Sequence, residues 1–105
     1  MATDPLTGGR YAEPSVLILT SLAGGPKHGY ALTQDIREFS GVELGPGTLY
    51  GALARLEGQG LIRALEADER RRPYQITSAG STTLQGHLSV LAKIARTGHS
   101  RLALS

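Results

Sequence analysis

Apolar positions divide the chain into segments, and the first of these is the most uniformly apolar. Residues 13–23 contain the run Val16 to Leu19, which suits either a strand or a buried helix. Pro14 fits the first turn of a helix, and Gly24-Gly25-Pro26 is a typical stop signal. Eleven residues are long for a strand and ordinary for a helix. The pattern predicts a helix that is buried on most sides.

A single apolar stripe at helical spacing marks residues 29–39. The stripe consists of Leu32, Ile36 and Phe39. The polar positions outside it are expected to face water: Gln34, Asp35, Arg37 and Glu38. Ser40-Gly41 ends this second helix, and residues 42–47 are too rich in Gly and Pro to be regular.

A third helix is predicted over residues 48–59. Leu49, Leu53 and Leu56 recur there at the same spacing, and Gly60 stands where a left-handed residue often ends a helix. The side turned away from these leucines holds a different mixture: Thr48, Tyr50, Gly51, Ala54 and Arg55. We expect this side to remain open.

Two short β-like stretches follow, separated by a polar turn. Residues 61–65 alternate poorly, whereas residues 72–76 place Tyr74 and Ile76 on one face. Pro73 cannot donate a ladder hydrogen bond, so it must lie at a sheet edge or at the start of a strand. A two-stranded ribbon is therefore predicted.

The last helix is predicted from Ser78 to about His99. Its apolar stripe alternates between spacings of four and three residues, and a repeat of about 3.5 residues describes a seam against another helix. This seam either lies back on the first helix or joins two copies of the chain. The dimer is favoured, because three short helices and a ribbon leave few partners for so long a stripe. The expected dimerisation residues are Leu84, Leu88, Leu91, Ile94 and Ala95.

The element order defines the fold class as mainly α with a small two-stranded β-ribbon. Three helices, a ribbon and a long helix are the order of a winged helix-turn-helix followed by a dimerisation helix. We expect residues 1–12 to be a flexible arm, residues 13–77 the DNA-binding domain, and residues 78–105 the dimerisation helix and tail. In this fold the third helix enters the major groove of DNA, which would explain its open side.

Three of the predicted DNA contacts on the third helix also have a structural alternative. Thr48 suits a phosphate oxygen, but Thr at a helix start is most often an N-cap. Tyr50 would contact DNA or pack half-buried against the second helix. Gly51 costs roughly 1 kcal/mol relative to Ala in a helix interior. Either close approach to DNA or a neighbouring helix would explain it. Arg55 completes the expected contacts on this helix.

The net charge of +2 conceals a strongly basic C-terminal region. From Arg70 to the end the sequence has six Lys or Arg residues and no acid, which indicates a polyanionic partner. Arg70, Arg71 and Arg72 lie at the ribbon turn. Consecutive side chains of a strand point to opposite faces, so at least one arginine should be free for phosphate. Such contacts supply affinity rather than sequence choice.

Composition excludes several other classes. Without cysteine the chain has neither disulfides nor thiolate metal sites, which fits an intracellular location. The N-terminal residues show no signal peptide, and the longest apolar run is far short of the ~20 residues of a membrane span. A soluble, cytoplasmic protein without membrane partner, metal or cofactor is expected.

Two other functional classes fit the sequence less well. An enzyme is disfavoured because His28, His87 and His99 are scattered, and neither a GxSxG nor a GxxxxGK[ST] motif is present. A winged helix that binds protein instead of DNA would have an apolar outer face on the third helix and a neutral ribbon turn. Arg55 and the three arginines of the turn argue against it.

The sequence resembles the PadR family of transcriptional regulators, in the compact subgroup with one C-terminal dimerisation helix. The resemblance covers about residues 14–84 and rests on motifs in the family's order and spacing. These motifs are Gly25-Pro26-Lys27-His28-Gly29-Tyr30-Ala31-Leu32, Gly45-Pro46-Gly47-Thr48-Leu49-Tyr50, Arg55-Leu56-Glu57, Gly60-Leu61-Ile62, Arg70-Arg71-Arg72 before Tyr74, and Ile76-Thr77 with Gly80.

The resemblance implies a homodimer that binds an inverted-repeat operator in double-stranded DNA, usually as a repressor. It also implies release by a small hydrophobic or phenolic effector, for which residues near Leu88, Val90 and Leu91 are candidates. By position it adds Lys27 and His28 to the expected DNA contacts. Two departures weaken the expected ribbon contact: the turn contains the acidic pair Asp68-Glu69, and Pro73 replaces a tyrosine. The operator sequence, the effector and the direction of regulation do not follow from the sequence.

Overall fold

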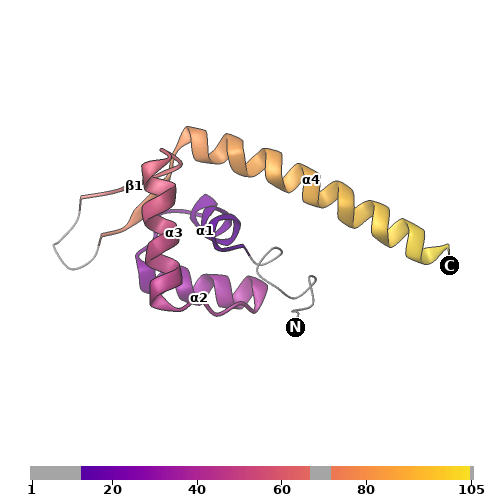
Figure 1. Ribbon diagram of the computed structural model, residues 1–105, viewed down its shortest axis with the longest axis horizontal. Coiled ribbons are helices and arrows are strands. Elements are labelled where there is room, and N and C mark those ends of the chain that lie inside the picture. The colour runs from indigo at the N-terminus through magenta and orange to yellow at the C-terminus, as the bar shows by residue number, and fades with distance from the viewer. Residues whose placement is uncertain (1–12, 67–71, 105) are drawn as a thin grey trace.

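A computed structural model of the chain describes residues 13–66 and 72–104, and Figure 1 shows the order of its elements. Three short helices form a cluster beside a two-stranded antiparallel sheet, and a long helix leaves this body and extends away from it. The elements are α1 (Pro14–Ala23), α2 (Gly29–Ser40), α3 (Pro46–Gly58), β1 (Ile62–Ala64), β2 (Tyr74–Ile76) and α4 (Ser78–Ala103). The predicted fold class is confirmed.

α1 lies at the centre of the body and contacts α2, α3, α4 and β2. Pro14 occupies the first turn, as predicted, and the chain leaves the helix through Gly24. Ile18 and Leu22 are among the most completely buried side chains of the protein. The described core joins all three helices to the sheet and to the start of α4. It consists of Leu17, Ile18, Leu19, Leu22, Leu32, Ile36, Leu49, Ala52, Leu53, Leu56, Ile62 and Leu84.

Gly41 is the C-cap of α2 and has a positive φ of 77°. Its N–H donates a hydrogen bond to the carbonyl of Arg37. Two predictions for this helix are wrong. Phe39 is 47% exposed, because the stripe continues into the last turn beyond the part that the core covers. Asp35 does not simply face water: its Oδ2 accepts a hydrogen bond of 2.6 Å from the buried Ser21 of α1.

α3 begins two residues before the predicted start. Gly45 is the N-cap and Pro46 occupies the first turn, where its missing N–H leaves no donor unsatisfied. The N-cap alternative for Thr48 is therefore wrong, since Thr48 lies inside the first turn. Gly60 follows the helix with φ 77°, which confirms the predicted left-handed position.

The sheet has a short antiparallel register in which Ile62 pairs with Ile76 and Ala64 with Tyr74. The strands are shorter than predicted, and Pro73 immediately precedes β2, as its missing N–H requires. A further backbone pair was not predicted. Lys27 and Tyr74 exchange two N–H to carbonyl hydrogen bonds of 2.9 and 3.1 Å, which fasten the segment before α2 to the outer side of β2.

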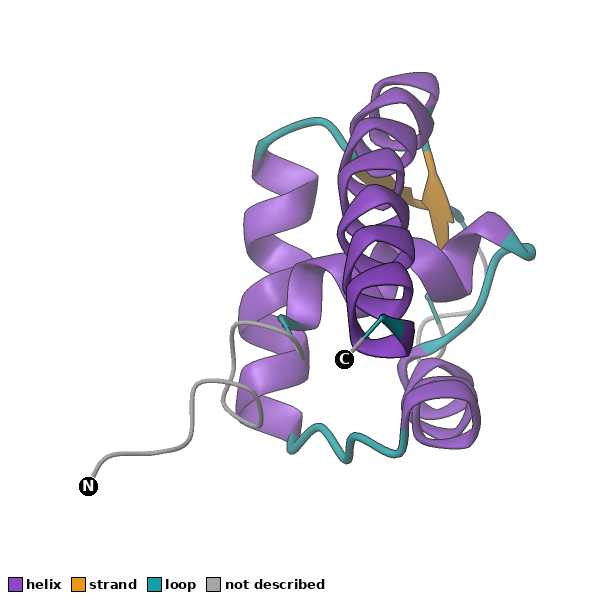
Figure 2. Cartoon of the chain, turned by 90° about the vertical axis from the view of Figure 1, so that its right-hand side faces the viewer, coloured by secondary structure: helices purple, strands orange, loops and turns teal. Residues whose placement is uncertain are grey.

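α4 begins at an N-cap that also secures the sheet. The Thr77 hydroxyl accepts a hydrogen bond from the Gly80 N–H and donates one to the Gly60 carbonyl. Gly80 is buried because α4 passes closely over Leu61 and Ile76. Figure 2, viewed nearly along α4, shows how this helix crosses over the body. It reaches Ala103, beyond the predicted end.

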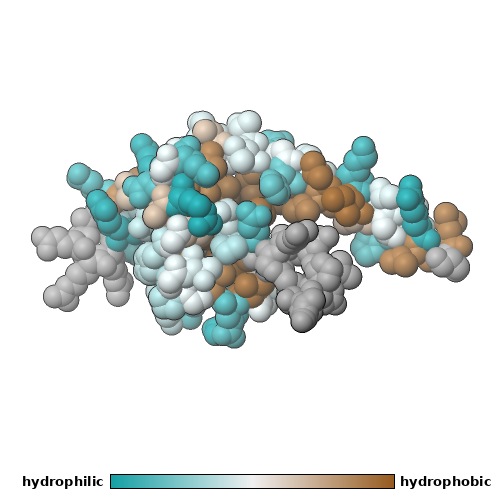
Figure 3. All heavy atoms as spheres, in the orientation of Figure 1, coloured by the Kyte–Doolittle hydropathy of each residue, from teal (hydrophilic) through white to brown (hydrophobic). Residues whose placement is uncertain are grey.

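Beyond its first turns α4 carries an apolar stripe that the described chain does not cover. Figure 3 shows apolar surface along this helix after it leaves the body. The exposed members include Leu88, Leu91, Ile94 and Leu102. Leu84 differs, because it is 5% exposed and belongs to the core of its own chain. Its assignment to a dimer seam is therefore corrected.

The predicted division at residues 12–13 and 77–78 stays a prediction, although α1 and α4 begin close to these positions. The predicted arm, residues 1–12, lies outside the described residues. None of the described helices combines the length and apolar character that a bilayer span requires.

Candidate nucleic-acid interface

The outer side of α3 is open, and this follows from the spacing of its apolar residues. Leu49, Ala52, Leu53 and Leu56 are each at most 3% exposed, so they occupy one side of the helix completely. The residues on the other side are exposed: Gly47, Thr48, Tyr50, Gly51, Ala54, Arg55, Glu57 and Gly58. No described part of the chain packs over this side, as predicted.

Small residues run down the middle of the open side. Gly47, Gly51, Ala54 and Gly58 follow one another at spacings of four, three and four residues, which keeps them in one row. A Cβ atom at Gly51 would meet no described heavy atom within 4 Å. Gly51 therefore does not make room for a neighbouring helix of the described chain. The row leaves the backbone of α3 accessible to a duplex.

Tyr50 and Arg55 flank this row. Tyr50 is 53% exposed, and its hydroxyl lies against Gly29 at the start of α2. It therefore combines the two alternatives, since it packs on α2 and still presents half of its surface to solvent. Arg55 is exposed, and its Nη2 donates a hydrogen bond of 3.4 Å to the Ser15 hydroxyl on α1.

Lys27 is turned into the protein, and the expectation that it contacts DNA stays a prediction. Its ammonium donates to the carbonyls of Ser21 and Gly25 and lies 3.9 Å from Asp35. The reason is the C-terminal end of α1, where the carbonyls form the negative end of the helix dipole and attract a cation. The same segment binds β2 through the backbone of Lys27, so this residue joins α1, α2 and the sheet.

His28 occupies the N-cap position of α2, but its side chain forms no capping hydrogen bond with that helix. Its Nδ1 is buried and has no hydrogen-bond partner among the described residues. The structure thus confirms that His28 lies at a helix start, as the sequence indicated. A DNA contact from this residue stays a prediction.

The wing consists of β1, β2 and their connecting turn. Arg70 and Arg71 lie outside the described residues, whereas Arg72 is described and exposed. On β1, the Arg63 Nε donates a hydrogen bond of 3.0 Å to Gln75 across the ribbon. Burial raises the pKa of the Tyr74 phenol, and the nearby Glu57 and Tyr50 raise it further, while Arg72 lowers it. Tyr74 therefore lies near Glu57 and Tyr50 of α3 as well as near the exposed Arg72.

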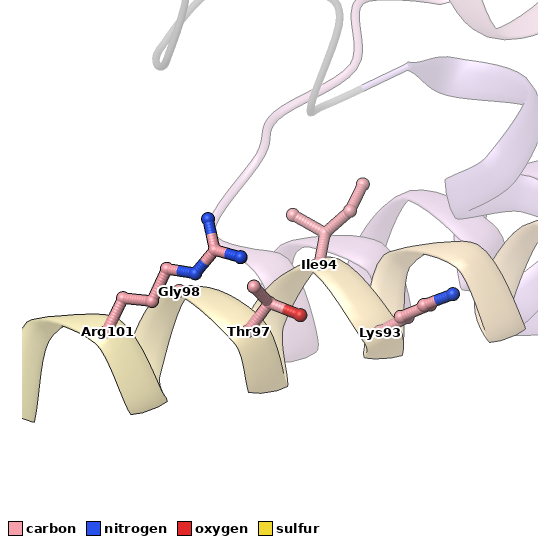
Figure 4. Close-up of a pocket in the computed structure, with 5 residues that line it drawn as sticks. All are labelled: Lys93, Ile94, Thr97, Gly98 and Arg101. Carbon is pink, nitrogen blue, oxygen red and sulfur yellow. The ribbon is translucent and has the colours of Figure 1, made fainter.

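Two open hollows lie along α4. One has a volume of about 400 Å³ between the end of α1 and α4, and its apolar lining includes Ala23, Leu84 and Leu88. The other has a volume of about 420 Å³, and the described residues that line it all belong to α4. Figure 4 shows Ile94 and Arg101 rising on either side of Gly98 in this second hollow.

The structure also brings together residues that were not predicted as part of the site. Gly29, Ser15 and Tyr74 each touch or influence a predicted contact residue from another element. Gly29 stands in the motif that leads into α2, but this motif did not indicate a contact with Tyr50. No pattern in the sequence indicated the contacts of Ser15 and Tyr74, because these contacts join segments that are far apart in the chain.

An open helix beside a two-stranded wing defines a winged helix-turn-helix of the kind that binds DNA. Consistent with this, the sequence matches the transcriptional regulator PadR-like family over residues 18–86. The chain belongs to this family. This is a family of transcriptional regulators.

Individual relatives agree with this assignment. An uncharacterized 37.1 kDa protein in transposon TN4556 of Streptomyces fradiae is 46% identical over 85 residues, covering 81% of this chain and 25% of that protein. The transcriptional regulator Rv3488 of Mycobacterium tuberculosis is 39% identical over 82 residues, covering 75% of this chain and 76% of that protein. This chain thus spans a quarter of the first relative and about three quarters of the second.

A solved structure shows the same fold. A PadR family transcription regulator from Clostridium difficile R20291 matches with a TM-score of 0.75 at 28% identity, over 85% of this chain and 97% of that one. The match therefore extends over most of both chains.

Proposed function

We propose that this protein regulates transcription as a homodimer that binds an inverted-repeat operator in double-stranded DNA, and that it acts as a repressor. The observation that carries this proposal is the open side of α3, which is free of cover from the described chain and flanked by Tyr50 and Arg55. PadR-like regulators bind DNA, and the family match extends over α3 and the wing.

In the proposed complex α3 enters the major groove. The row of small residues brings the helix backbone near the base edges, while Arg55 and Tyr50 reach bases or phosphates on either side of it. Thr48, in the exposed first turn of α3, is suited to a phosphate oxygen, because the first N–H groups of a helix have no partner within it. In this complex Arg72 contacts the phosphate backbone of the duplex from the wing.

The exposed stripe of α4 supports the homodimer. Leu88, Leu91 and Ile94 are 41%, 38% and 59% exposed. Exposing this apolar surface to water is unfavourable, and packing against a second copy of the helix would remove the exposure. Ala95 lies on the same side of the helix. A twofold partner places the second α3 about 34–36 Å away along the duplex, one helical turn, which makes the operator an inverted repeat.

Release by a small hydrophobic or phenolic effector is the finer part of the proposal. The hollow between α1 and α4 is lined mainly by apolar side chains, and the dimer partner would help to enclose it. An effector bound there would act on α4 and so on the spacing of the two α3 helices.

Selection of bound fragments from a random duplex pool tests the proposal. The expected result is an enriched inverted repeat whose half-sites are about one helical turn apart. Enrichment of a single half-site would contradict the dimer geometry. No enrichment and no binding at low salt would contradict DNA binding and leave a protein-contact role for the winged helix.

A further inference from the structure

Gly29 is buried at the first position of α2, and its missing side chain leaves a space that Tyr50 fills. A Cβ atom built at Gly29 would overlap the Tyr50 hydroxyl and come within 3.1 Å of Tyr50 Cζ. It would also lie 3.6 Å from Leu49 Cδ2, which is ordinary contact. The phenol of Tyr50 is therefore the group that requires glycine at this position.

The Gly29–Tyr50 contact lies where three parts of the DNA-binding surface meet. Gly29 begins α2 and Tyr50 belongs to α3. Two residues before Gly29, the backbone of Lys27 pairs with Tyr74 of the wing. Tyr50 is also close enough to Tyr74 to raise the pKa of its phenol. The Tyr50 ring is thus held beside the border between α3 and the wing.

We propose that Gly29 is a positioning residue for DNA recognition, because its lack of a side chain lets the Tyr50 phenol lie over the start of α2. This inference rests on the proposed function, in which Tyr50 contacts DNA. From this position the ring is 53% exposed, so its outer face is available to a duplex while its hydroxyl lies against Gly29. The ring then needs little ordering when DNA binds.

The consequence of a side chain at position 29 is specific. The atoms that an added methyl group would overlap are at the far end of a tyrosine side chain and not in the backbone. Rotation about the side-chain bonds of Tyr50 relieves the overlap, so the ring moves and the fold remains. Gly29 also lies in the first turn of α2, where replacement by Ala does not weaken a helix interior.

The test is a double-mutant cycle of Gly29→Ala and Tyr50→Phe in the full chain. The first measurement is the NMR signals of the Tyr50 ring without DNA. The second is the Kd for a synthetic duplex that carries the selected sequence. Gly86→Ala is the matched control, because Gly86 is also helical but an added Cβ there meets no described atom within 4 Å.

We expect Gly29→Ala to shift the Tyr50 ring signals and to weaken DNA binding about tenfold, because the displaced ring no longer packs against the duplex. In the Tyr50→Phe background the hydroxyl is gone and the overlap is largely removed, so Gly29→Ala should add less than a twofold further loss. Gly86→Ala should leave both measurements unchanged.

Two results would overturn the inference. One is unchanged Tyr50 signals in Gly29→Ala, which would show that the ring does not depend on position 29. The other is an equal loss of DNA affinity in both backgrounds, or no loss in either, which would show that Gly29 does not act through Tyr50. These outcomes differ from failure of the proposed function, in which the wild-type chain binds no duplex at all.

Discussion

Ser21 of α1 donates a hydrogen bond of 2.6 Å to the Asp35 carboxylate of α2, and the ammonium of Lys27 lies 3.9 Å from the same oxygen. Ser21 is 2% exposed and is the one polar side chain of the described residues that is buried. Lys27 also donates a hydrogen bond to the Ser21 carbonyl. The three residues therefore join α1 to α2 at the segment that links the two helices and lies beside the wing.

Ser21→Ala should therefore destabilise the protein. The substitution removes a hydrogen bond to a charged group, but solvent reaches Asp35 and partly replaces the lost donor. We expect the free energy of unfolding to fall by about 1–2 kcal/mol, measured by urea denaturation. Ser100→Ala, at an exposed position of α4, should change it by less than about 0.5 kcal/mol. Equal effects of the two substitutions would show that the Ser21 bond contributes nothing.

The contact of α4 with the sheet predicts a strong effect at Gly80. A Cβ atom there would overlap the Leu61 carbonyl oxygen and lie 2.8 Å from Ile76 Cγ1, and the backbone atom cannot rotate away. Gly80→Ala should lower the free energy of unfolding by about 1–3 kcal/mol through overpacking. Gly86→Ala should instead raise it by about 0.5–1 kcal/mol, because its added methyl group meets no described atom. Urea denaturation of both variants measures these changes, and a neutral Gly80→Ala would contradict the close packing.

The raised pKa of the Tyr74 phenol predicts that the protein loses stability at high pH. Burial and the nearby Glu57 and Tyr50 raise the pKa of its phenol in the folded chain. Above the unfolded pKa of about 10 the unfolded chain therefore releases its proton first, and the free energy of unfolding falls as the pH rises through the folded pKa. Tyr74→Phe should reduce this fall. Tyr30→Phe, at a ring that is 75% exposed, serves as the control. Denaturation at pH 8 to 11 measures the slopes, and parallel curves for wild type and Tyr74→Phe would contradict the prediction.

The open side of α3 followed from the sequence because one physical rule determines it. A short helix with Leu49, Leu53 and Leu56 on one side must bury that side, so the opposite side is left for a partner. The same rule failed for Phe39, which continues the apolar stripe of α2 into a turn that the core does not cover. Spacing predicts which side of a helix is apolar, but not how far the neighbouring elements extend.

The inward turn of Lys27 and the packing of Tyr50 on Gly29 were not predictable in the same way. Both contacts join residues of different elements, and their geometry depends on how the helices are placed relative to one another. A cation beside a DNA-binding helix suggested a phosphate contact, whereas the carbonyls at the end of α1 offered a closer partner. The sequence thus predicted the exposed surface better than the contacts that position it.

The proposed dimer predicts that a charge in the stripe of α4 separates the two copies. Leu91→Glu would bury a carboxylate against apolar side chains of the second helix, so the dimer should dissociate to monomers at micromolar concentration. Ser100→Glu adds the same charge nine residues later, about two and a half turns along α4 and thus on its opposite side. This variant should remain a dimer. Light scattering measures the mass, and a dimeric Leu91→Glu protein would place the interface elsewhere.

The wing predicts a change in the salt dependence of DNA binding. Arg72 is exposed near Tyr74, on the side of the molecule that carries α3 and the wing. If it neutralises one phosphate, Arg72→Ala should reduce the slope of log K against log salt by about 0.9, with little change in the preferred sequence. Lys93→Ala removes the same charge from α4, away from the wing, and should leave the slope as it is. Fluorescence anisotropy with the selected duplex at several salt concentrations gives both slopes. An unaltered slope for Arg72→Ala would show that this arginine makes no phosphate contact, and the affinity would then come from α3.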